Sequence, residues 1–233
     1  RFDVGTGSLV EDLAVQGDFL YVAGAIDGLA IWDVSDPAHP FRTARWLPWT
    51  WSHTTLSAKV VVDERGFAFL CDGCGLSVIA TRTSAGPVRI ASIQSRDRCF
   101  ADVALTANLA VAFEPFYMGR FLVFDVSRPE APVELASVSM LPPPVYQPLL
   151  AAHRSTLYLV DGRWPSLFVF DLWDPRAPRE LARLGLSGPR YGTEEVAVNG
   201  RVLALSGYGE FYLVDVSDPF HPVEVGPAPD PGG

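Results

Sequence analysis

The chain has 233 residues, of which 48% are hydrophobic and 19% are charged. This composition is typical of a folded protein with a sizeable core and excludes a disordered chain. The formal net charge of −9 disfavours nucleic acid and anionic membrane surfaces as partners, because binding to either requires a basic face. The sequence contains no run of 18 apolar residues, so we expect no membrane insertion.

A motif that recurs five times organises the chain. It reads LAIWDVSDPAHP at 29–40, LSVIATRTSAGP at 76–87, FLVFDVSRPEAP at 121–132, LFVFDLWDPRAP at 167–178 and FYLVDVSDPFHP at 211–222. The second copy is the most divergent. The equivalent positions are Asp33, Ala80, Asp125, Asp171 and Asp215, so successive copies lie 44 to 47 residues apart. Such even spacing indicates tandem structural repeats.

Each repeat contains four short apolar runs. In the first repeat they are 12–15, 19–23, 29–34 and 42–47, and in the fifth they are 195–198, 202–206, 211–216 and 223–226. The runs are rich in Val, Leu, Phe and Tyr and are bounded by Gly, Pro, Asn and Asp, which predicts strands joined by turns. The third run is apolar on both alternating sides, so we expect a strand that is buried on both faces.

Four strands in every 40 to 50 residues is the period of a propeller blade. We therefore predict an all-β fold, a five-bladed β-propeller with four antiparallel strands per blade in one domain that spans residues 1–233. The predicted blades are 9–47, 54–94, 100–140, 149–186 and 194–227. Residues 1–8 resemble one further strand, which would either help to close the last blade or be the remnant of an upstream repeat.

The turn after the third strand identifies a family resemblance. The D-V-S-D-P-x-x-P pattern resembles the LVIVD repeat family over residues 9–227, clearly in four repeats and poorly in the second, where Ala80-Thr81-Arg82-Thr83 replaces the Asp-led turn. The resemblance implies a propeller fold. It also implies a bacterial secreted or cell-surface protein without a well-defined activity, although the sequence shows no targeting signal.

The Asp that leads this turn has two interpretations. Asp33, Asp125, Asp171 and Asp215 could be metal ligands, or each could accept backbone N–H bonds and fix its own turn. Four equivalent residues on four different blades would lie far apart. We therefore predict the turn-fixing role, and we predict no metal ion and no cofactor.

The best candidate for a binding surface is one end of the blades. With the strands of a blade lettered a to d, the b–c loops and the d–a connections emerge on the same face, and function tends to lie on such loops. These segments are rich in aromatic residues and Arg, which is the composition of binding hot spots. The candidate ligand-binding residues are Trp49, Trp51, His53, Arg98, Tyr117, Tyr146, Trp164, Tyr191 and Tyr208.

The first d–a connection contains three tryptophans within six residues, Trp46, Trp49 and Trp51. In an extended segment Trp49 and Trp51 point the same way and could form an aromatic platform for a sugar. The alternative is that the indoles fill the gap between the first two blades, because large aromatic side chains mostly serve packing.

The three cysteines lie near the second repeat. Cys71 and Cys74 flank an Asp-Gly pair in the second b–c loop, and Cys99 lies in the next d–a connection on the same face. A disulfide from Cys99 to Cys71 or Cys74 would fit this placement, as would free thiols. A three-thiolate metal site completed by His53 is a further alternative.

The sequence contains no motif that fixes a reaction. Asp12, Asp102 and Glu195 recur at the start of the first strand and could act as paired carboxylates in glycoside hydrolysis. Because they recur with the repeat, we predict a structural or solvating role for them instead. We predict a non-enzymatic propeller scaffold that binds a protein or other ligand through its loop-rich face. The alternatives are a lectin-like carbohydrate-binding module and a glycoside hydrolase.

Overall fold

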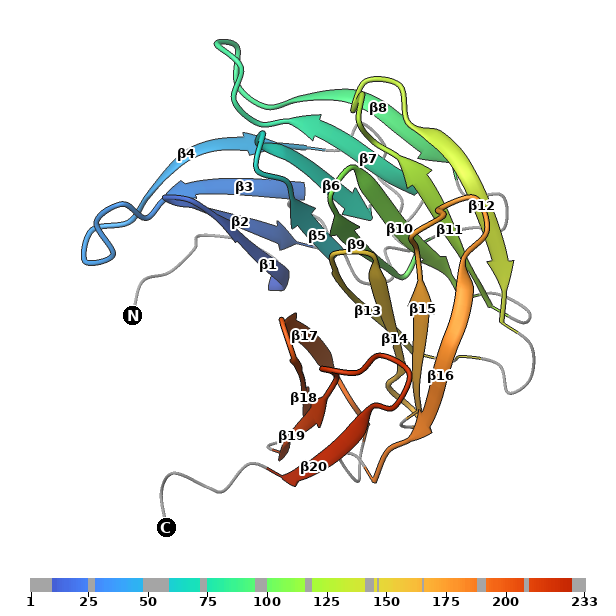
Figure 1. The fold of residues 1–233 in the computed structure, drawn as a ribbon. Helices are drawn as coiled ribbons and strands as arrows, with labels where there is room; N and C mark the ends of the chain where they lie inside the picture. Colours follow the sequence, from blue (N-terminus) through green and yellow to red (C-terminus); the bar gives the residue numbers. More distant parts are fainter. Residues whose placement is uncertain are drawn as a thin grey trace. The chain divides into compact units, whose positions relative to one another are not determined.

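The computed structural model describes residues 10–24, 28–47, 59–71, 75–94, 100–115, 119–140, 145, 147–164, 166–187, 192–207 and 210–227. In this part of the chain all regular elements are β-strands. They form five four-stranded antiparallel sheets, each made of four strands that follow one another in the sequence (Figure 1). The prediction of an all-β, five-bladed propeller with four antiparallel strands per blade is confirmed.

The blades have the following strands. Blade 1 contains β1 (Val10–Gln16), β2 (Phe19–Gly24), β3 (Gly28–Asp33) and β4 (Phe41–Trp46). Blade 2 contains β5 (Lys59–Val62), β6 (Phe67–Cys71), β7 (Gly75–Ala80) and β8 (Val88–Gln94). Blade 3 contains β9 (Asp102–Thr106), β10 (Leu109–Glu114), β11 (Arg120–Asp125) and β12 (Val133–Ser139). Blade 4 contains β13 (Pro148–His153), β14 (Thr156–Asp161), β15 (Ser166–Asp171) and β16 (Arg179–Gly185). Blade 5 contains β17 (Glu195–Asn199), β18 (Val202–Gly207), β19 (Glu210–Asp215) and β20 (Val223–Pro227).

The chain divides into two compact units. Unit 1 comprises Arg1–Phe116 and Phe124–Val133, and unit 2 comprises Tyr117–Val123 and Glu134–Gly233. Within unit 1 the first strands β1, β5 and β9 contact one another in that order, and within unit 2 β13 contacts β17. Sheets that follow one another through their first strands are the arrangement expected of propeller blades. The predicted single domain and the role of residues 1–8 stay predictions, and residues 1–8 lie outside the described residues.

The hydrophobic core lies between successive blades. In unit 1, Tyr21 and Ile31 of blade 1 pack against Val60 and Leu70 of blade 2. In unit 2, the same positions of blades 4 and 5 form a second cluster of buried residues, which includes Tyr158, Val169, Leu203 and Leu205. In each of these pairs, one face of a blade's sheet therefore packs against a face of the neighbouring blade's sheet.

The burial of the third strands explains why their sequences are apolar at successive positions. β3, β7, β11 and β15 are buried at nearly every position, as expected for a strand covered on both faces. β19 differs, because Phe211 is exposed and Leu213 is only half-buried. The prediction of double burial is therefore confirmed for four blades, and within unit 2 one face of the blade 5 sheet is packed.

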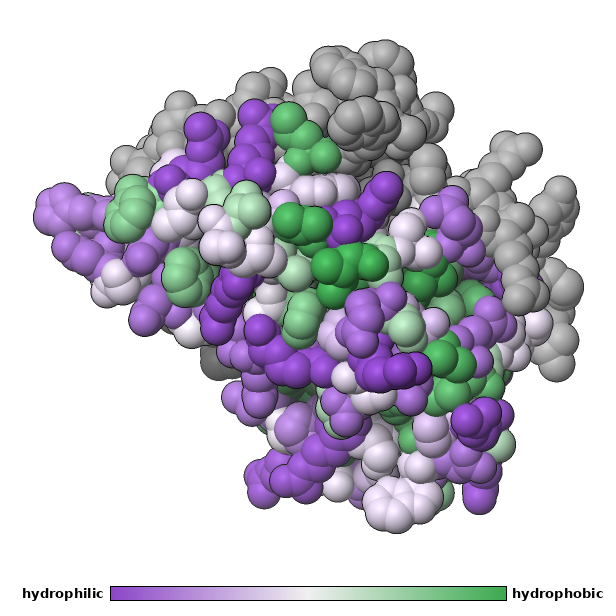
Figure 2. Space-filling model, turned by 90° about the horizontal axis from the view of Figure 1, so that it is seen from above, coloured by the Kyte–Doolittle hydropathy of each residue, from purple (hydrophilic) through white to green (hydrophobic). Residues whose placement is uncertain are grey.

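The fourth strands form the outer edges of the sheets. Several of them begin with an exposed apolar residue, namely Phe41, Val88, Val133 and Val223. On the face displayed in Figure 2, green apolar side chains lie singly or in small groups among purple polar ones. Single exposed apolar residues are ordinary on protein surfaces, so these positions do not by themselves mark a site.

Candidate ligand-binding site

The four Asp-led turns share one hydrogen bond. Oδ1 of the Asp that ends the third strand accepts from the backbone N–H two residues later. The pairs are Asp33 with Ser35 at 2.9 Å, Asp125 with Ser127 at 2.8 Å, Asp171 with Trp173 at 2.8 Å, and Asp215 with Ser217 at 2.8 Å. The predicted turn-fixing role of the recurring Asp is therefore confirmed.

Two of these turns also use a second Asp and a His. The Nδ1 atom of His39 lies 2.8 Å from Oδ2 of Asp36, and Asp36 Oδ1 accepts from the N–H of Ala38. Asp218 and His221 repeat this arrangement in blade 5. The contact with the His side chain, followed by the backbone N–H bond, lowers the pKa of Asp36, and the same causes lower the pKa of Asp218. The exposed histidines thus belong to the turn structure.

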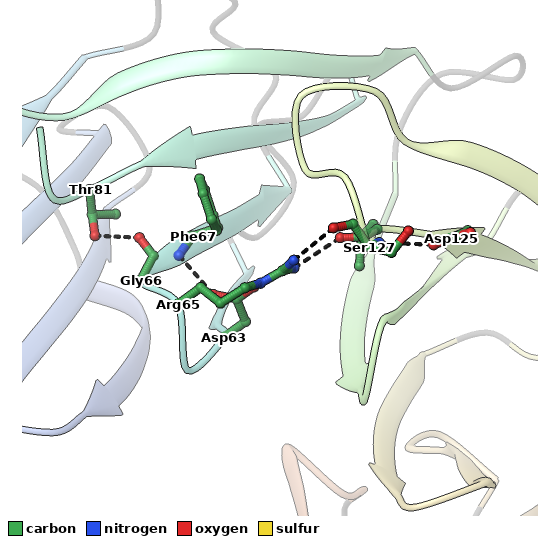
Figure 3. A network of polar contacts seen from close by, with 8 residues as sticks. Asp63, Arg65, Gly66, Phe67, Thr81, Asp125 and Ser127 are labelled. Atoms are coloured by element: carbon green, nitrogen blue, oxygen red, sulfur yellow. Dashed lines mark hydrogen bonds and ion pairs between the residues drawn. The ribbon is translucent and has the colours of Figure 1, made fainter.

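Blade 2 breaks the symmetry with bonds that reach the next blade. Arg65, in the hairpin between β5 and β6, donates through Nη1 to the carbonyl of Ser127 and through Nη2 to that of Val126, both at 2.9 Å (Figure 3). Its Nε also donates to Asp63 Oδ2 at 2.7 Å. On the other side of blade 2, the guanidinium of Arg82 lies 5.5 Å from the ring centroid of Phe19 in blade 1. These contacts tie neighbouring blades together.

No residue pattern in the sequence directly marks Arg65. The one indirect signal is hairpin length, because Asp63-Glu64-Arg65-Gly66 connects β5 to β6 with four residues, whereas the equivalent hairpins have two. The features that distinguish blade 2 from the other blades, as far as the structure describes them, are therefore contacts that hold neighbouring blades together.

The structure describes one of the nine predicted binding residues. The other eight lie outside the described residues, namely Trp49, Trp51, His53, Arg98, Tyr117, Tyr146, Tyr191 and Tyr208. Trp46, the first of the three neighbouring tryptophans, packs against the cluster between blades 1 and 2, in agreement with the packing interpretation for that residue. Trp164 is the predicted binding residue that the structure describes.

Trp164 is presented on a fixed turn. It follows β14 in the b–c loop of blade 4, and its side chain is 64% exposed. The preceding Asp161 is buried, and its Oδ1 accepts from the N–H of Arg163 at 3.0 Å and from that of Trp164 at 3.4 Å. A buried carboxylate that binds successive backbone N–H groups fixes the local backbone. The indole is therefore displayed from a backbone that is held in place.

A close backbone contact supports this turn. Gly162 donates its N–H to the carbonyl of Gln147 at 2.7 Å, and the Thr193 N–H donates to the Gly162 carbonyl at 2.8 Å. A Cβ atom at Gly162 would lie 2.4 Å from the Thr193 carbonyl oxygen, and one at Gly207 would lie 2.2 Å from the Gly192 oxygen. These distances require glycine, so the loop base of blades 4 and 5 is built from closely packed backbone. Sequence reasoning selected Trp164 but missed this base.

The recurring carboxylates have different surroundings in the structure. Asp12 accepts the backbone N–H of Val60 at 2.8 Å and lies 3.9 Å from Nζ of Lys59, which links blade 1 to blade 2. Asp102 is buried and accepts the N–H of Val103 at 2.7 Å. Glu195 begins β17 and is exposed. For Asp12 and Asp102 this bonding favours the structural role.

The cysteine predictions are only partly covered. Cys71 ends β6 and is completely buried, whereas Cys74 and Cys99 lie outside the described residues, so the disulfide stays a prediction. Among the residues that the structure describes, no three His, Cys, Asp or Glu side chains are grouped as a metal ion would require. Over the same ranges no helix has the length and apolar character needed to cross a membrane.

The fold defines the class of protein, a five-bladed β-propeller. The LVIVD repeat model matches residues 7–45 and 193–228, which are the first and fifth repeats, so the resemblance is confirmed. No curated protein matches the sequence.

Two solved structures are similar to this chain in fold. A crystal structure of a protein from Lactobacillus plantarum has a TM-score of 0.72 and 16% identity, with 94% of this chain and 70% of that chain covered. The computationally designed Ika8 protein has a TM-score of 0.66 and 13% identity, with 97% and 63% covered. At these identities the likeness shows the fold alone. Since 589 solved chains match, the fold does not select a function.

Proposed function

We propose that this chain is a non-enzymatic scaffold that binds a protein through the face formed by its b–c loops and d–a connections. The observation that carries the proposal is Trp164, an exposed indole on a turn that Asp161 holds from below. Tryptophan is among the residues most enriched at the energetic centres of protein interfaces. The neighbouring Arg163 adds a planar cation of the kind that accompanies such anchors.

The fixed backbone matters for the affinity that such an anchor can provide. Binding costs free energy when mobile side chains and loops are ordered at the interface. The bonds that Asp161 accepts and the close contact of Gly162 with Thr193 restrict the loop before any partner arrives. An anchor on this loop therefore loses little conformational entropy on binding.

The test compares two exposed tryptophans of blade 4. Trp164 lies in the b–c loop, and Trp173 lies in the c–d turn at the opposite end of the same blade, with a side chain that is 84% exposed. Protein ligands would be selected from a displayed library against the whole chain. We expect Trp164→Ala to weaken binding of the selected ligands by at least about 30-fold, the size of a hot-spot effect. Trp173→Ala is the matched control and should leave the affinity unchanged.

The same measurement separates the alternatives. Equal losses in both variants, or none in either, would contradict the assignment of this face. The exposed indole also suits stacking on a sugar ring, so a glycan-array signal that Trp164→Ala removes would favour the lectin-like module. Turnover of a polysaccharide that Glu195→Gln abolishes would favour the glycoside hydrolase.

The resemblance to LVIVD repeats supports a location outside the cell or on its surface, where a binding scaffold would meet its partner. Fractionation of the cells that produce the protein tests this location. Recovery of the chain only from the cytoplasm would contradict it.

A further inference from the structure

A cavity lies between the a–b hairpins of blades 2 and 3, at the opposite end of these blades from their b–c loops. It is lined by residues 62–65 of blade 2 and 105–108 of blade 3, and its volume is about 390 Å³. Pockets that bind small molecules have volumes of about 300 to 1,000 Å³. All eight lining residues belong to unit 1, so the cavity is a feature of that unit by itself.

The wall from blade 2 is a long hairpin that is held in place. Its four residues, 63–66, compare with two in each of the other a–b hairpins. Asp63 Oδ1 accepts the N–H of Phe67 at 2.9 Å, and the Asp63 carbonyl accepts the N–H of Gly66 at 3.0 Å. The Arg65 side chain extends from this hairpin to the c–d turn of blade 3 (Figure 3). A wall that is fixed before binding lowers the entropic cost of binding a ligand.

The wall from blade 3 has a small side chain in its hairpin. Ala107 has a φ of 48°, and the equivalent residues of the other two-residue hairpins are Gly17, Arg154 and Gly200, with φ of 58°, 55° and 60°. This left-handed turn position therefore accepts both Gly and Arg in the same chain. Because Ala107 lines the cavity, a side chain as long as that of Arg154 would take up part of the space.

The charged side chains of the cavity carry one negative charge in excess. The Asp63 carboxylate is paired with Arg65, whose Nη2 lies 2.7 Å from Oδ2. Glu64 is exposed, and among the described residues no hydrogen bond or ion pair involves its carboxylate. Val62 and Leu105 add half-buried apolar surface to the lining. The cavity therefore favours a ligand that combines a positive charge with a compact apolar skeleton.

We propose that this cavity binds a small organic cation, namely a protonated amine. The ammonium group lies against the Glu64 carboxylate, and the carbon skeleton lies against Val62 and Leu105. An anionic ligand is disfavoured because Glu64 would repel it. This site is separate from the proposed protein-binding face, because the a–b hairpins and the b–c loops lie at opposite ends of a blade.

The experiment measures binding of two amines and their neutral counterparts to the whole chain by ligand-observed NMR titration at neutral pH. The probes are cyclohexylamine and benzylamine, compared with cyclohexanol and benzyl alcohol, which have the same skeletons without the charge. We expect the wild-type chain to bind the amines with millimolar dissociation constants. The alcohols should bind about fivefold more weakly, which is the effect of one partly exposed ion pair.

Two pairs of variants locate the site. Glu64→Gln should weaken binding of the amines about fivefold and leave binding of the alcohols unchanged. Glu130→Gln is its matched control, because Glu130 is an exposed carboxylate in the c–d turn of blade 3 that does not line the cavity. Ala107→Arg should abolish binding of all four probes, whereas Ala107→Gly should preserve it. Both side chains occur at the equivalent position of other hairpins.

Three results would overturn the proposal. They are no binding of either amine to the wild-type chain at millimolar concentrations, equal amine affinities of the wild type and Glu64→Gln, and unchanged binding by a folded Ala107→Arg chain. Circular dichroism checks the fold of each variant. If Ala107→Arg is unfolded, the comparison of Glu64→Gln with Glu130→Gln decides, because both substitutions change exposed side chains.

Discussion

The Asp-led turns and the turn of blade 2 close the same kind of hairpin with different bonds. In blade 1 the Asp33 carboxylate binds Ser35 two residues away, and the Val34 N–H donates to the carbonyl of Asp18 in the a–b hairpin at 2.8 Å. In blade 2, Ala80 stands in place of the Asp. There both the N–H and the hydroxyl of Thr81 donate to the Gly66 carbonyl, at 3.2 and 2.6 Å.

The two regions also differ in how far along the sequence their side-chain bonds reach. The longer hairpin of blade 2 carries Arg65, which binds the carbonyls of Val126 and Ser127 in the Asp-led turn of blade 3 (Figure 3). An Asp that binds two residues ahead stabilises only its own turn, whereas Arg65 joins segments about sixty residues apart in the sequence. The two regions should therefore respond differently to substitution.

The largest effect is expected for Arg65→Ala. The change leaves the carbonyls of Val126 and Ser127 without this donor and removes the charge that faces Asp63, whose side chain is largely buried. Charge-assisted hydrogen bonds of a partly exposed Arg make the expected loss about 2 kcal/mol of unfolding free energy, measured by urea denaturation. Arg65→Lys should recover only part of it, because an ammonium cannot form the fork. A loss below about 0.5 kcal/mol would indicate that the contact is an ordinary surface pair.

The role of Arg65 illustrates what the sequence could not predict. The turn bond of Asp33 is local, so the order Asp-x-Ser before a Pro-rich turn was enough to predict it. The partners of Arg65 are backbone carbonyls in another repeat. Every residue has a backbone carbonyl, so the residue types do not indicate which carbonyls Arg65 binds. Only the length of the 63–66 hairpin marked this place as different.

A second, smaller effect is expected at Asp125, where the two kinds of bond meet. Asp125 fixes the N–H of Ser127, and Arg65 binds the carbonyl of the same residue. Asp125→Ala should cost about 1 kcal/mol, as the loss of a capping carboxylate does. Because both side chains act on Ser127, the double variant with Arg65→Ala should deviate from additivity by about 0.5 to 1 kcal/mol.

The control for this cycle is Asp33→Ala, whose turn shares no hydrogen-bond partner with Arg65 among the described residues. That pair of substitutions should be additive. Equal coupling in both cycles would show that Arg65 acts on the fold as a whole and not on the turn of blade 3.

In the candidate site, as for Asp33 and Arg65, one feature could be predicted from the sequence and another could not. Trp164 was predicted because the b–c loops lie on the candidate binding face and because aromatic residues beside Arg are typical of binding hot spots. The backbone base beneath it depends on Gly162 and Gly207, which approach the carbonyls of Thr193 and Gly192. Glycine in a loop usually signals only a turn, so neither close contact could be inferred from residue types.

The smallest effect is expected on the unfolding free energy at acid pH. It concerns the Asp-led turns, which contain titrating carboxylates, and not the turn of blade 2. The Ser35 hydroxyl, followed by its backbone N–H, lowers the pKa of Asp33, and Ser217 has the same effect on Asp215. A carboxylate whose pKa is lower in the folded chain contributes stability above its unfolded pKa, near 3.8. That stability is lost as the pH falls through the lower folded value. Because the turns are at the surface, solvent keeps the contribution small.

The variant that tests this effect combines Asp33→Asn, Asp36→Asn, Asp215→Asn and Asp218→Asn. The amide oxygen of Asn can still accept the turn bonds, but the side chain does not titrate. Blade 2 lacks the leading Asp, and its Thr81 bonds do not titrate, so the change removes titrating turns without altering that region. The unfolding free energy of the variant should therefore fall less than that of the wild type between about pH 5 and pH 3. Parallel curves for the two proteins over this interval would mean that the turn carboxylates have the same pKa folded and unfolded.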